Sequence, residues 1–195
     1  MTSPARTDFK AGRLYRTRDL RQWSANPTRL AQRMVKEGKL RRAAQGLFYA
    51  PIPSRFGAAP PKETEILRAF FGDSPFIISG PPRWNSLGLG STALFAATLI
   101  YNTKRSGEFR FDGRPYLLRR VLFPKNPSPE YFVIDLLQQH DMAGVSLSEL
   151  ERGLVATLYQ GRWDNDRLEE MGKRFGSKTT QALVNRALRG PKGTA

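Results

Sequence analysis

The sequence contains no cysteine and only one histidine, His140. Without cysteine the chain can form no disulfide framework, no cysteine nucleophile and no thiolate zinc site. A single histidine excludes a histidine-rich metal site, and any histidine-based triad would have to use His140. No stretch approaches the roughly 20 apolar residues that span a bilayer, and Met1–Arg13 lacks the apolar core of a signal peptide. We therefore expect a cytoplasmic protein with no membrane partner.

Acidic residues are also scarce. The 195 residues include 32 Lys and Arg but only 17 Asp and Glu, which gives a net charge of +15. Residues 1–61 carry 13 basic and 3 acidic side chains, residues 62–125 carry 10 and 5, and residues 126–195 carry 9 and 9. A basic excess of this size indicates a polyanionic partner, either nucleic acid or an anionic membrane surface, and its position indicates that the first third of the chain binds it.

Proline is concentrated in one segment. Residues 50–61 have the sequence APIPSRFGAAPP, with four prolines. Because proline fixes φ, lacks the backbone donor and restricts the preceding residue, neither a helix nor a central strand is expected there. The sequence therefore predicts an N-terminal domain at 1–50, a Pro-rich linker at 51–61 and a second domain at 62–195.

Two helices are predicted in the first domain. Thr17 is suited to cap a short helix that runs through Trp23. Asn26 and Pro27 are favourable as the N-cap and first residue of a second helix, and Gly38 is suited to end it. The second helix is amphipathic, with an apolar stripe and a polar, cationic face.

The order of elements in this domain indicates a DNA-binding fold. Short apolar segments on both sides of Gly46 predict a β-hairpin after the second helix. Two helices across a turn, followed by a basic hairpin, have the order of a winged helix-turn-helix, whose second helix enters the major groove. The polar face of an isolated amphipathic helix is more often only solvated, but here the helix, the hairpin and the whole domain are basic. We expect contacts with double-stranded DNA from ten residues: Arg16, Arg18, Thr28, Arg29, Gln32, Arg33, Lys36, Arg41, Arg42 and Gln45.

Several segments resemble one known family. Residues 12–20 (GRLYRTRDL), 30–38, 40–42 (LRR) and 46–51 (GLFYAP) are similar to the N-terminal winged helix of the AbiEi antitoxins. More loosely, three later segments also fall where the family has comparable ones: 76–80 (FIISG), 87–89 (LGL) and 131–137 (YFVIDLL). The similarity thus extends over most of the chain, and its specific part lies in the first fifty residues.

The AbiEi antitoxins are the antitoxin halves of type IV toxin–antitoxin pairs. The resemblance implies a DNA-binding protein that represses its own operon through operator repeats. It also implies a functional partner, a nucleotidyltransferase-like toxin, which the antitoxin opposes without the need for direct contact. The resemblance assigns the antitoxin activity to the second domain.

The second domain is predicted to mix strands and helices. Asp112-Gly113 lies between two strand-like segments, 108–111 and 116–123, and this dipeptide favours a tight hairpin turn. From Pro129 onward the spacing of apolar residues becomes helical. The fold class is therefore α+β, a winged helix-turn-helix followed by a mixed α+β domain that ends in a helical bundle.

No set of residues has the pattern of an active site. Residues 88–92 (GLGST) resemble a phosphate loop but lack its lysine. Their Gly-Ser pair resembles that of nucleotidyltransferases, but no carboxylate for a metal pair follows until Glu108. Asp164 and Asp166 lie near a predicted helix start, and His140 lies near a helix end, where their charges suit the helix dipole. We expect no catalytic residue, no metal site and no cofactor, and a protein that is not an enzyme.

Two points stay open from the sequence. Four arginines on or beside the predicted hairpin can extend the DNA footprint, meet an acidic partner or protect an exposed sheet edge: Arg110, Arg114, Arg119 and Arg120. Two other functions also compete with the antitoxin. One is a stand-alone winged-helix regulator with a ligand-sensing C-terminal domain, and the other is a nucleic-acid-processing enzyme that uses the first domain for targeting.

Overall fold

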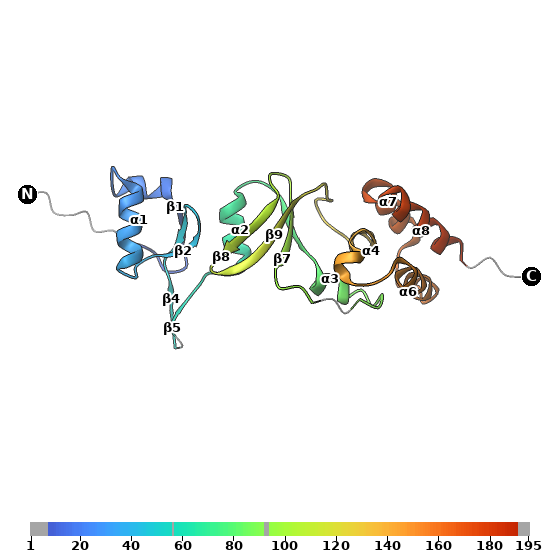
Figure 1. Cartoon of the computed structure of the whole chain (residues 1–195). Coiled ribbons are helices and arrows are strands. Elements are labelled where there is room, and N and C mark those ends of the chain that lie inside the picture. The colour runs from blue at the N-terminus through green and yellow to red at the C-terminus, as the bar shows by residue number, and fades with distance from the viewer. Residues whose placement is uncertain (1–7, 56, 92–93, 191–195) are drawn as a thin grey trace, which may run out of the picture. The chain divides into compact units, whose positions relative to one another are not determined.

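A computed structural model describes residues 8–55, 57–91 and 94–190 of the chain. The fold is α+β, as predicted, with helices and small antiparallel sheets (Figure 1). The chain divides into two compact units. The N-terminal unit consists of the residues up to Ser74 together with Glu108–Tyr116, and the C-terminal unit consists of Pro75–Gly107 and the residues from Leu117 onward.

The N-terminal unit begins with a three-stranded sheet and two helices. Its elements are β1 (Leu14–Arg16), the 3₁₀ helix η1 (Thr17–Gln22), α1 (Pro27–Lys36), β2 (Arg41–Ala44) and β3 (Leu47–Tyr49). The strands are antiparallel in the order β1-β3-β2. The predicted second helix and hairpin are confirmed, and the helix, expected to run from Pro27 to Glu37, ends at Lys36 because Glu37 forms its C-cap.

One face of this sheet carries the core of the first fifty residues. Tyr15 and Phe48 are paired across β1 and β3, and both are buried with side chains of η1 and α1. The apolar residues of the predicted helical stripe, Leu30 and Met34, are 3% and 2% exposed. Phe9 packs edge-on against Tyr15 with ring centroids 5.2 Å apart, and so closes the core from the N-terminal side.

The Pro-rich segment forms a hairpin of its own. β4 (Ile52–Ser54) and β5 (Gly57–Ala59) pair antiparallel as a two-stranded sheet. Pro53 fits in this sheet because each strand has an open edge, where no partner needs the missing N–H group. The segment predicted as a linker therefore contains a short two-stranded hairpin, and its described residues form neither a helix nor a central strand.

The N-terminal unit extends beyond the predicted boundary. It includes α2 (Glu63–Phe71), where the carbonyl oxygen of Ala69 accepts two hydrogen bonds from the Arg16 guanidinium at 3.1 and 2.7 Å. It also includes a turn more than fifty residues later, where Asp112 accepts a hydrogen bond of 2.7 Å from the Tyr49 hydroxyl. These long-range bonds explain why the compact unit differs from the predicted domain of residues 1–50.

The predicted Asp-Gly turn is confirmed between β8 (Gly107–Phe111) and β9 (Arg114–Arg120). Asp112 and Gly113 have φ values of 49° and 78°, as the favoured two-residue hairpin turn requires. With β6 (Phe76–Ser79) and β7 (Thr98–Asn102), these strands have the order β6-β7-β9-β8.

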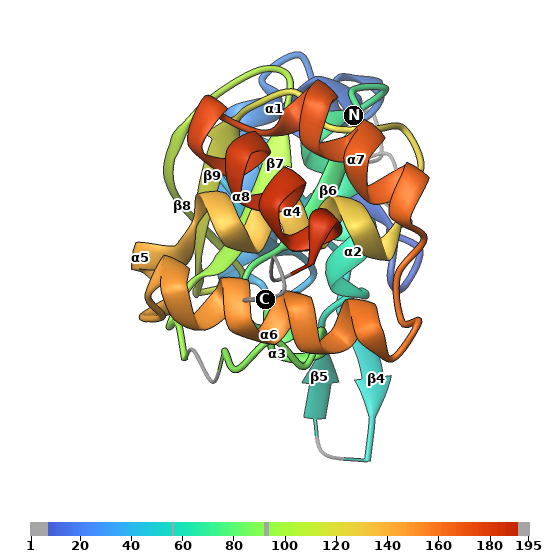
Figure 2. The same ribbon diagram turned by 90° about the vertical axis from the view of Figure 1, so that its right-hand side faces the viewer.

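The rest of the C-terminal unit is helical. Its helices are α3 (Pro81–Asn85), α4 (Pro129–Gln138), α5 (His140–Ala143), α6 (Leu147–Tyr159), α7 (Asn165–Phe175) and α8 (Lys178–Arg189). Residues 131–137 of α4 are all buried, and α4 packs against α3, α7 and α8 (Figure 2). Among the described residues, no helix combines the length and the apolar character that crossing a bilayer requires.

A buried carboxylate joins α4 to the sheet of the C-terminal unit. Asp135 is 3% exposed and accepts hydrogen bonds from the Ser79 hydroxyl, from Trp84 Nε1 at 2.8 Å and from the Tyr101 hydroxyl at 2.6 Å. Burial raises the pKa of Asp135, and the three hydrogen bonds oppose this rise. Three donors from β6, α3 and β7 therefore converge on one side chain of α4.

Candidate nucleic-acid interface

Local contacts fix both ends of α1. Asn26 Oδ1 accepts a hydrogen bond of 3.0 Å from the Arg29 N–H group, and Pro27 is the first helical residue, as predicted. Beyond the other end, Gly38 has a φ of 72° and allows the Lys39 N–H group to bond to the helix at 2.9 Å. These contacts set where the helix begins and ends, and therefore which side chains face the solvent.

The polar face of α1 is exposed over its whole length. Five of the predicted DNA-binding residues form it: Thr28, Arg29, Gln32, Arg33 and Lys36. With 3.6 residues per turn, they cover a continuous arc of about 140° around the helix. The opposite side is held in the core by Leu30, Ala31 and Met34. The exposed face of α1 is therefore cationic, and the buried residues on the opposite side of the helix keep it turned toward the solvent.

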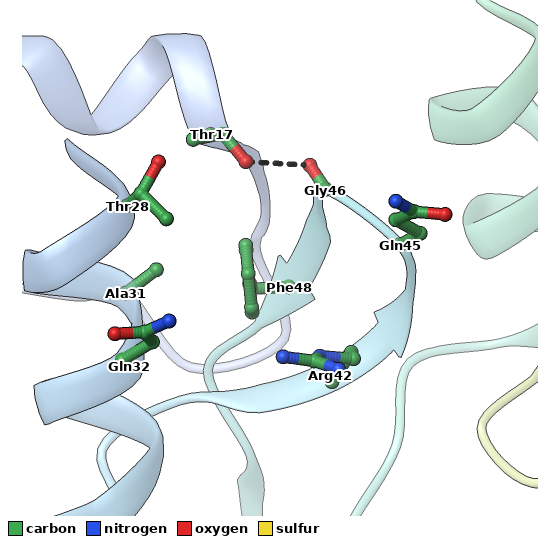
Figure 3. A pocket seen from close by; sticks show the side chains of 8 residues that line it. All are labelled: Thr17, Thr28, Ala31, Gln32, Arg42, Gln45, Gly46 and Phe48. Carbon is green, nitrogen blue, oxygen red and sulfur yellow. Dashed lines mark hydrogen bonds between the residues drawn. The ribbon is translucent and has the colours of Figure 1, made fainter.

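A hollow of about 480 Å³ lies between α1 and the β2–β3 hairpin (Figure 3). In Figure 3, Thr28, Ala31 and Gln32 of α1 face Phe48 and Arg42 of the sheet. The complete lining is Thr17, Thr28, Ala31, Gln32, Arg42, Gln45, Gly46 and Phe48. The hollow therefore brings together four of the ten predicted residues, which come from a helix, a strand and a turn.

The alternation of β2 separates the two arginines of the hairpin. Arg42 pairs with Phe48 in the register and lines the hollow beside α1. Arg41 pairs with Tyr49 and donates a hydrogen bond of 3.4 Å to the carbonyl oxygen of Ala58 in β5. The two side chains therefore lie on different faces of the sheet, and only Arg42 joins the polar face of α1.

Residues at the start of η1 have structural roles. Arg16 is the N-cap of η1, where Thr17 was expected, and the Arg16 guanidinium is bound to Ala69. The N–H group of Thr17 instead donates to the carbonyl oxygen of Gly46 at 3.0 Å, which holds the β2–β3 turn. Arg18 is exposed, with its guanidinium 3.7 Å from Asp19. Of these predicted contact residues, Arg18 is therefore more accessible than Arg16.

Arg33 lies at the margin of the polar face. Its guanidinium is 3.8 Å from the carboxylate of Glu37. The same carboxylate forms an ion pair of 2.9 Å with the Lys39 ammonium group. The hydrogen bond from Lys39, together with the charges of Lys39 and Arg33, lowers the pKa of Glu37. The acid next to the polar face therefore stays ionised and is balanced by cations on both sides.

The chemistry of the hollow suits the edges of base pairs and the phosphates beside them. The Gln32 amide can bond to adenine in two places, and the Thr28 hydroxyl can donate or accept. The Arg42 guanidinium is suited to phosphate or guanine. Ala31 and Phe48, which are 1% and 5% exposed, form the apolar floor of the hollow.

The motifs weighed as catalytic have other contacts. The hydroxyl of the buried Ser91 donates to Asn85 Oδ1 at 2.9 Å, while Thr92 lies outside the described residues. Asp164 caps α7 by accepting from the Arg167 N–H group at 3.0 Å. His140 Nδ1 lies 3.3 Å from Asp141. Within the described parts of the chain, no group of three or more His, Asp or Glu side chains could hold a metal ion.

Comparison with known proteins gives a likeness in fold. No family model matches the sequence, and no curated protein matches it. The chain is similar in structure to RV2827C protein from Mycobacterium tuberculosis, known from a crystal structure, with a TM-score of 0.58 and 12% sequence identity. The similarity covers 90% of this chain and 71% of that one. At this identity the likeness concerns the fold alone.

Proposed function

We propose that the N-terminal unit contains a winged helix-turn-helix that binds double-stranded DNA. In this proposal α1 lies in the major groove and the β2–β3 turn lies beside the backbone. The element order β1-η1-α1-β2-β3 and the sheet order β1-β3-β2 support it. The observation that carries it is the hollow beside α1, where Thr28, Gln32, Arg42 and Gln45 meet on an exposed surface of a strongly basic segment.

The side chains divide into two roles in this proposal. Thr28 and Gln32 meet base edges, because they lie on the side of α1 that faces the hollow. Arg42, with Arg29 and Lys36 on the exposed arc of α1, contacts phosphates and positions the helix. Phosphate contacts supply most of the affinity, and the two polar uncharged side chains supply the preference for one sequence.

We further propose that the protein is the antitoxin of a type IV toxin–antitoxin pair. It represses its own operon by binding operator repeats, and it opposes a nucleotidyltransferase-like toxin without a need for direct contact. The resemblance of residues 12–20 and 46–51 to the AbiEi antitoxins supports this step. The basic charge of the first third of the chain suits the DNA-binding part of that role.

The DNA-binding step is tested with the full-length protein. Fluorescence anisotropy compares a labelled duplex from the region upstream of its own gene with a scrambled duplex at the same salt concentration. We expect tighter binding to the upstream duplex, by roughly 10³-fold or more. Equal affinity for the two duplexes would overturn operator recognition.

The antitoxin step is tested by growth. A nucleotidyltransferase encoded next to this gene is expressed alone and together with the full-length protein, and rescue of growth is expected. Operator binding without rescue would favour the stand-alone regulator. Metal-dependent cleavage of DNA or RNA by the purified protein would favour the enzyme.

A further inference from the structure

A second basic surface lies on the C-terminal unit. It is formed by the loop that follows β7 and by the end of β9, and we call it the basic loop: Lys104, Arg105, Arg119 and Arg120. The two segments lie side by side, because the Asn102 amide donates to the carbonyl oxygens of both Arg105 and Arg119, at 2.9 and 3.3 Å. The Arg120 N–H group also donates to the Ser106 hydroxyl at 2.9 Å.

A buried asparagine holds the basic loop in one conformation. Asn102 is 0% exposed, and its Oδ1 accepts from the N–H groups of Lys104 and Arg105 at 2.9 and 2.8 Å. With the two bonds that it donates, all the hydrogen-bonding capacity of this side chain serves the loop. The Arg119 guanidinium is held by Gln139 Oε1 at 2.6 Å. The exposed side chains of Lys104, Arg105 and Arg120 therefore project from a preorganised support.

Basic side chains predominate around the basic loop along the sequence, where Glu108, three residues after Arg105, is the nearest acid. Before residue 126, the C-terminal unit consists of residues 75–107 and 117–125. These two segments contain six Lys and Arg and no Asp or Glu. Residues 126–195 are balanced, with nine of each. The basic excess of this unit is therefore confined to the segments that form and flank the loop. Such a local excess is typical of a surface that binds a polyanion.

We propose that the basic loop is a second phosphate-binding surface, which contacts the backbone of double-stranded DNA without reading its sequence. The inference rests on the proposed function in one respect, that the ligand is duplex DNA. An anionic membrane is the less favoured ligand. Within the described part of the chain, the exposed large apolar residues that adjoin the basic loop in sequence are Val121 and Leu122, 37% and 83% exposed, and an interfacial membrane contact needs a continuous apolar face.

The second surface has a consequence for affinity. The two units belong to one chain, so binding by one raises the effective concentration of the other at the same duplex. The basic loop then adds affinity equally for every sequence, while the hollow beside α1 sets the preference. It takes up one of the alternatives left open by the sequence, in which Arg119 and Arg120 extend the DNA footprint of the first domain.

The test uses the full-length protein and a triple variant of the basic loop, Lys104→Ala, Arg105→Ala and Arg120→Ala. Arg119 is retained because Gln139 holds it. The matched control removes three exposed cations of the balanced region, by Arg152→Ala, Lys178→Ala and Arg189→Ala. Binding to a 40-base-pair random duplex is followed by anisotropy across a salt series. We expect the slope of log K against log salt to fall by about 0.9 per lost contact, about 2.7 in all, only in the loop variant.

The outcomes separate this inference from the proposed function. A loop variant with the slope of the unchanged protein, or with the same loss as the control, would overturn the inference. Stronger loop-dependent binding to transfer RNA or to phosphatidylserine vesicles than to the duplex would also overturn it. A Gln32→Ala variant that keeps full operator preference would instead count against the proposed function alone. Far-ultraviolet circular dichroism checks that each variant is folded.

Discussion

Arg41 and Arg42 are neighbours in the sequence, but their side chains lie on opposite faces of β2. Arg42 lines the hollow beside α1, whereas Arg41 reaches Ala58 on the other side of the sheet. A two-residue periodicity of the strand therefore gives two adjacent cations different surroundings.

This difference predicts unequal effects on DNA binding. Arg42→Ala should weaken binding to any duplex and lower the salt slope by about 0.9, the value for one phosphate contact. Arg41→Ala is the matched control, with the same loss of charge one residue away, and should have the smaller effect. Anisotropy in a salt series measures both slopes. Equal slopes for the two variants would place both arginines, or neither, on the DNA.

Gln32 is expected to carry sequence preference, whereas Arg33 is not. Gln32 faces the hollow, and Arg33 lies at the edge of the face beside Glu37. Gln32→Ala should cost roughly 1–3 kcal/mol on the operator and little on random DNA. Arg33→Ala should weaken both duplexes alike. Competition between operator and scrambled duplex measures this, and the reverse result would make Arg33 the base-reading residue.

The bond between Tyr49 and Asp112 should stabilise the N-terminal unit. Tyr49→Phe removes the hydroxyl but keeps the ring, and leaves Asp112 to water. We expect a loss of about 1 kcal/mol in the free energy of unfolding in urea. Tyr159→Phe, at a residue 71% exposed, is the control and should change stability by less than about 0.5 kcal/mol. Similar effects of both variants would show that the long-range bond contributes little.

Asp135 should be one of the most sensitive polar residues in the chain. Asp135→Ala would leave the buried donors of Ser79, Trp84 and Tyr101 without their acceptor. We expect a loss of about 3 kcal/mol or more in unfolding free energy. Asp141→Asn, on a side chain 95% exposed, should cost less than about 1 kcal/mol. Urea unfolding of both variants checks the contrast.

The same residue predicts a pH dependence. Burial raises the pKa of Asp135 above the value of about 3.9 in an unfolded chain. The native state therefore holds this proton more tightly, and the stability that it contributes is lost as pH rises from about 4 through the raised pKa. The side chain of the Asp135→Asn variant cannot titrate. As pH rises, the free energy of unfolding of the unchanged protein should therefore fall relative to that of this variant. A difference that is constant from pH 4 to pH 7 would contradict the prediction.

Elements with local signals were predictable from the sequence. The dipeptide Asn26-Pro27 and the glycine at position 38 define α1, because caps and positive φ values depend on neighbouring atoms only. The Asp112-Gly113 turn is determined in the same way. The α+β class also followed, since the periodicity of apolar residues changes from that of strands to that of helices along the second half of the chain.

Other features depend on contacts between distant residues. Nothing near Arg16 or Tyr49 in the sequence indicates that they bind Ala69 and Asp112, 53 and 63 residues later. These bonds form only when the chain is folded, and they extend the N-terminal unit beyond its predicted border. The hairpin at 52–59 was missed because prolines exclude a central strand but not two short strands with open edges.

The candidate site shows the same division. The sequence by itself determined which residues are polar, basic and on the outer face of a helix, since these follow from composition and a 3.6-residue repeat. Only the tertiary structure decided which of them meet. The register of β2 against β3 directs Arg42 toward Gln32 and turns Arg41 away, and register depends on pairing between strands rather than on either strand alone.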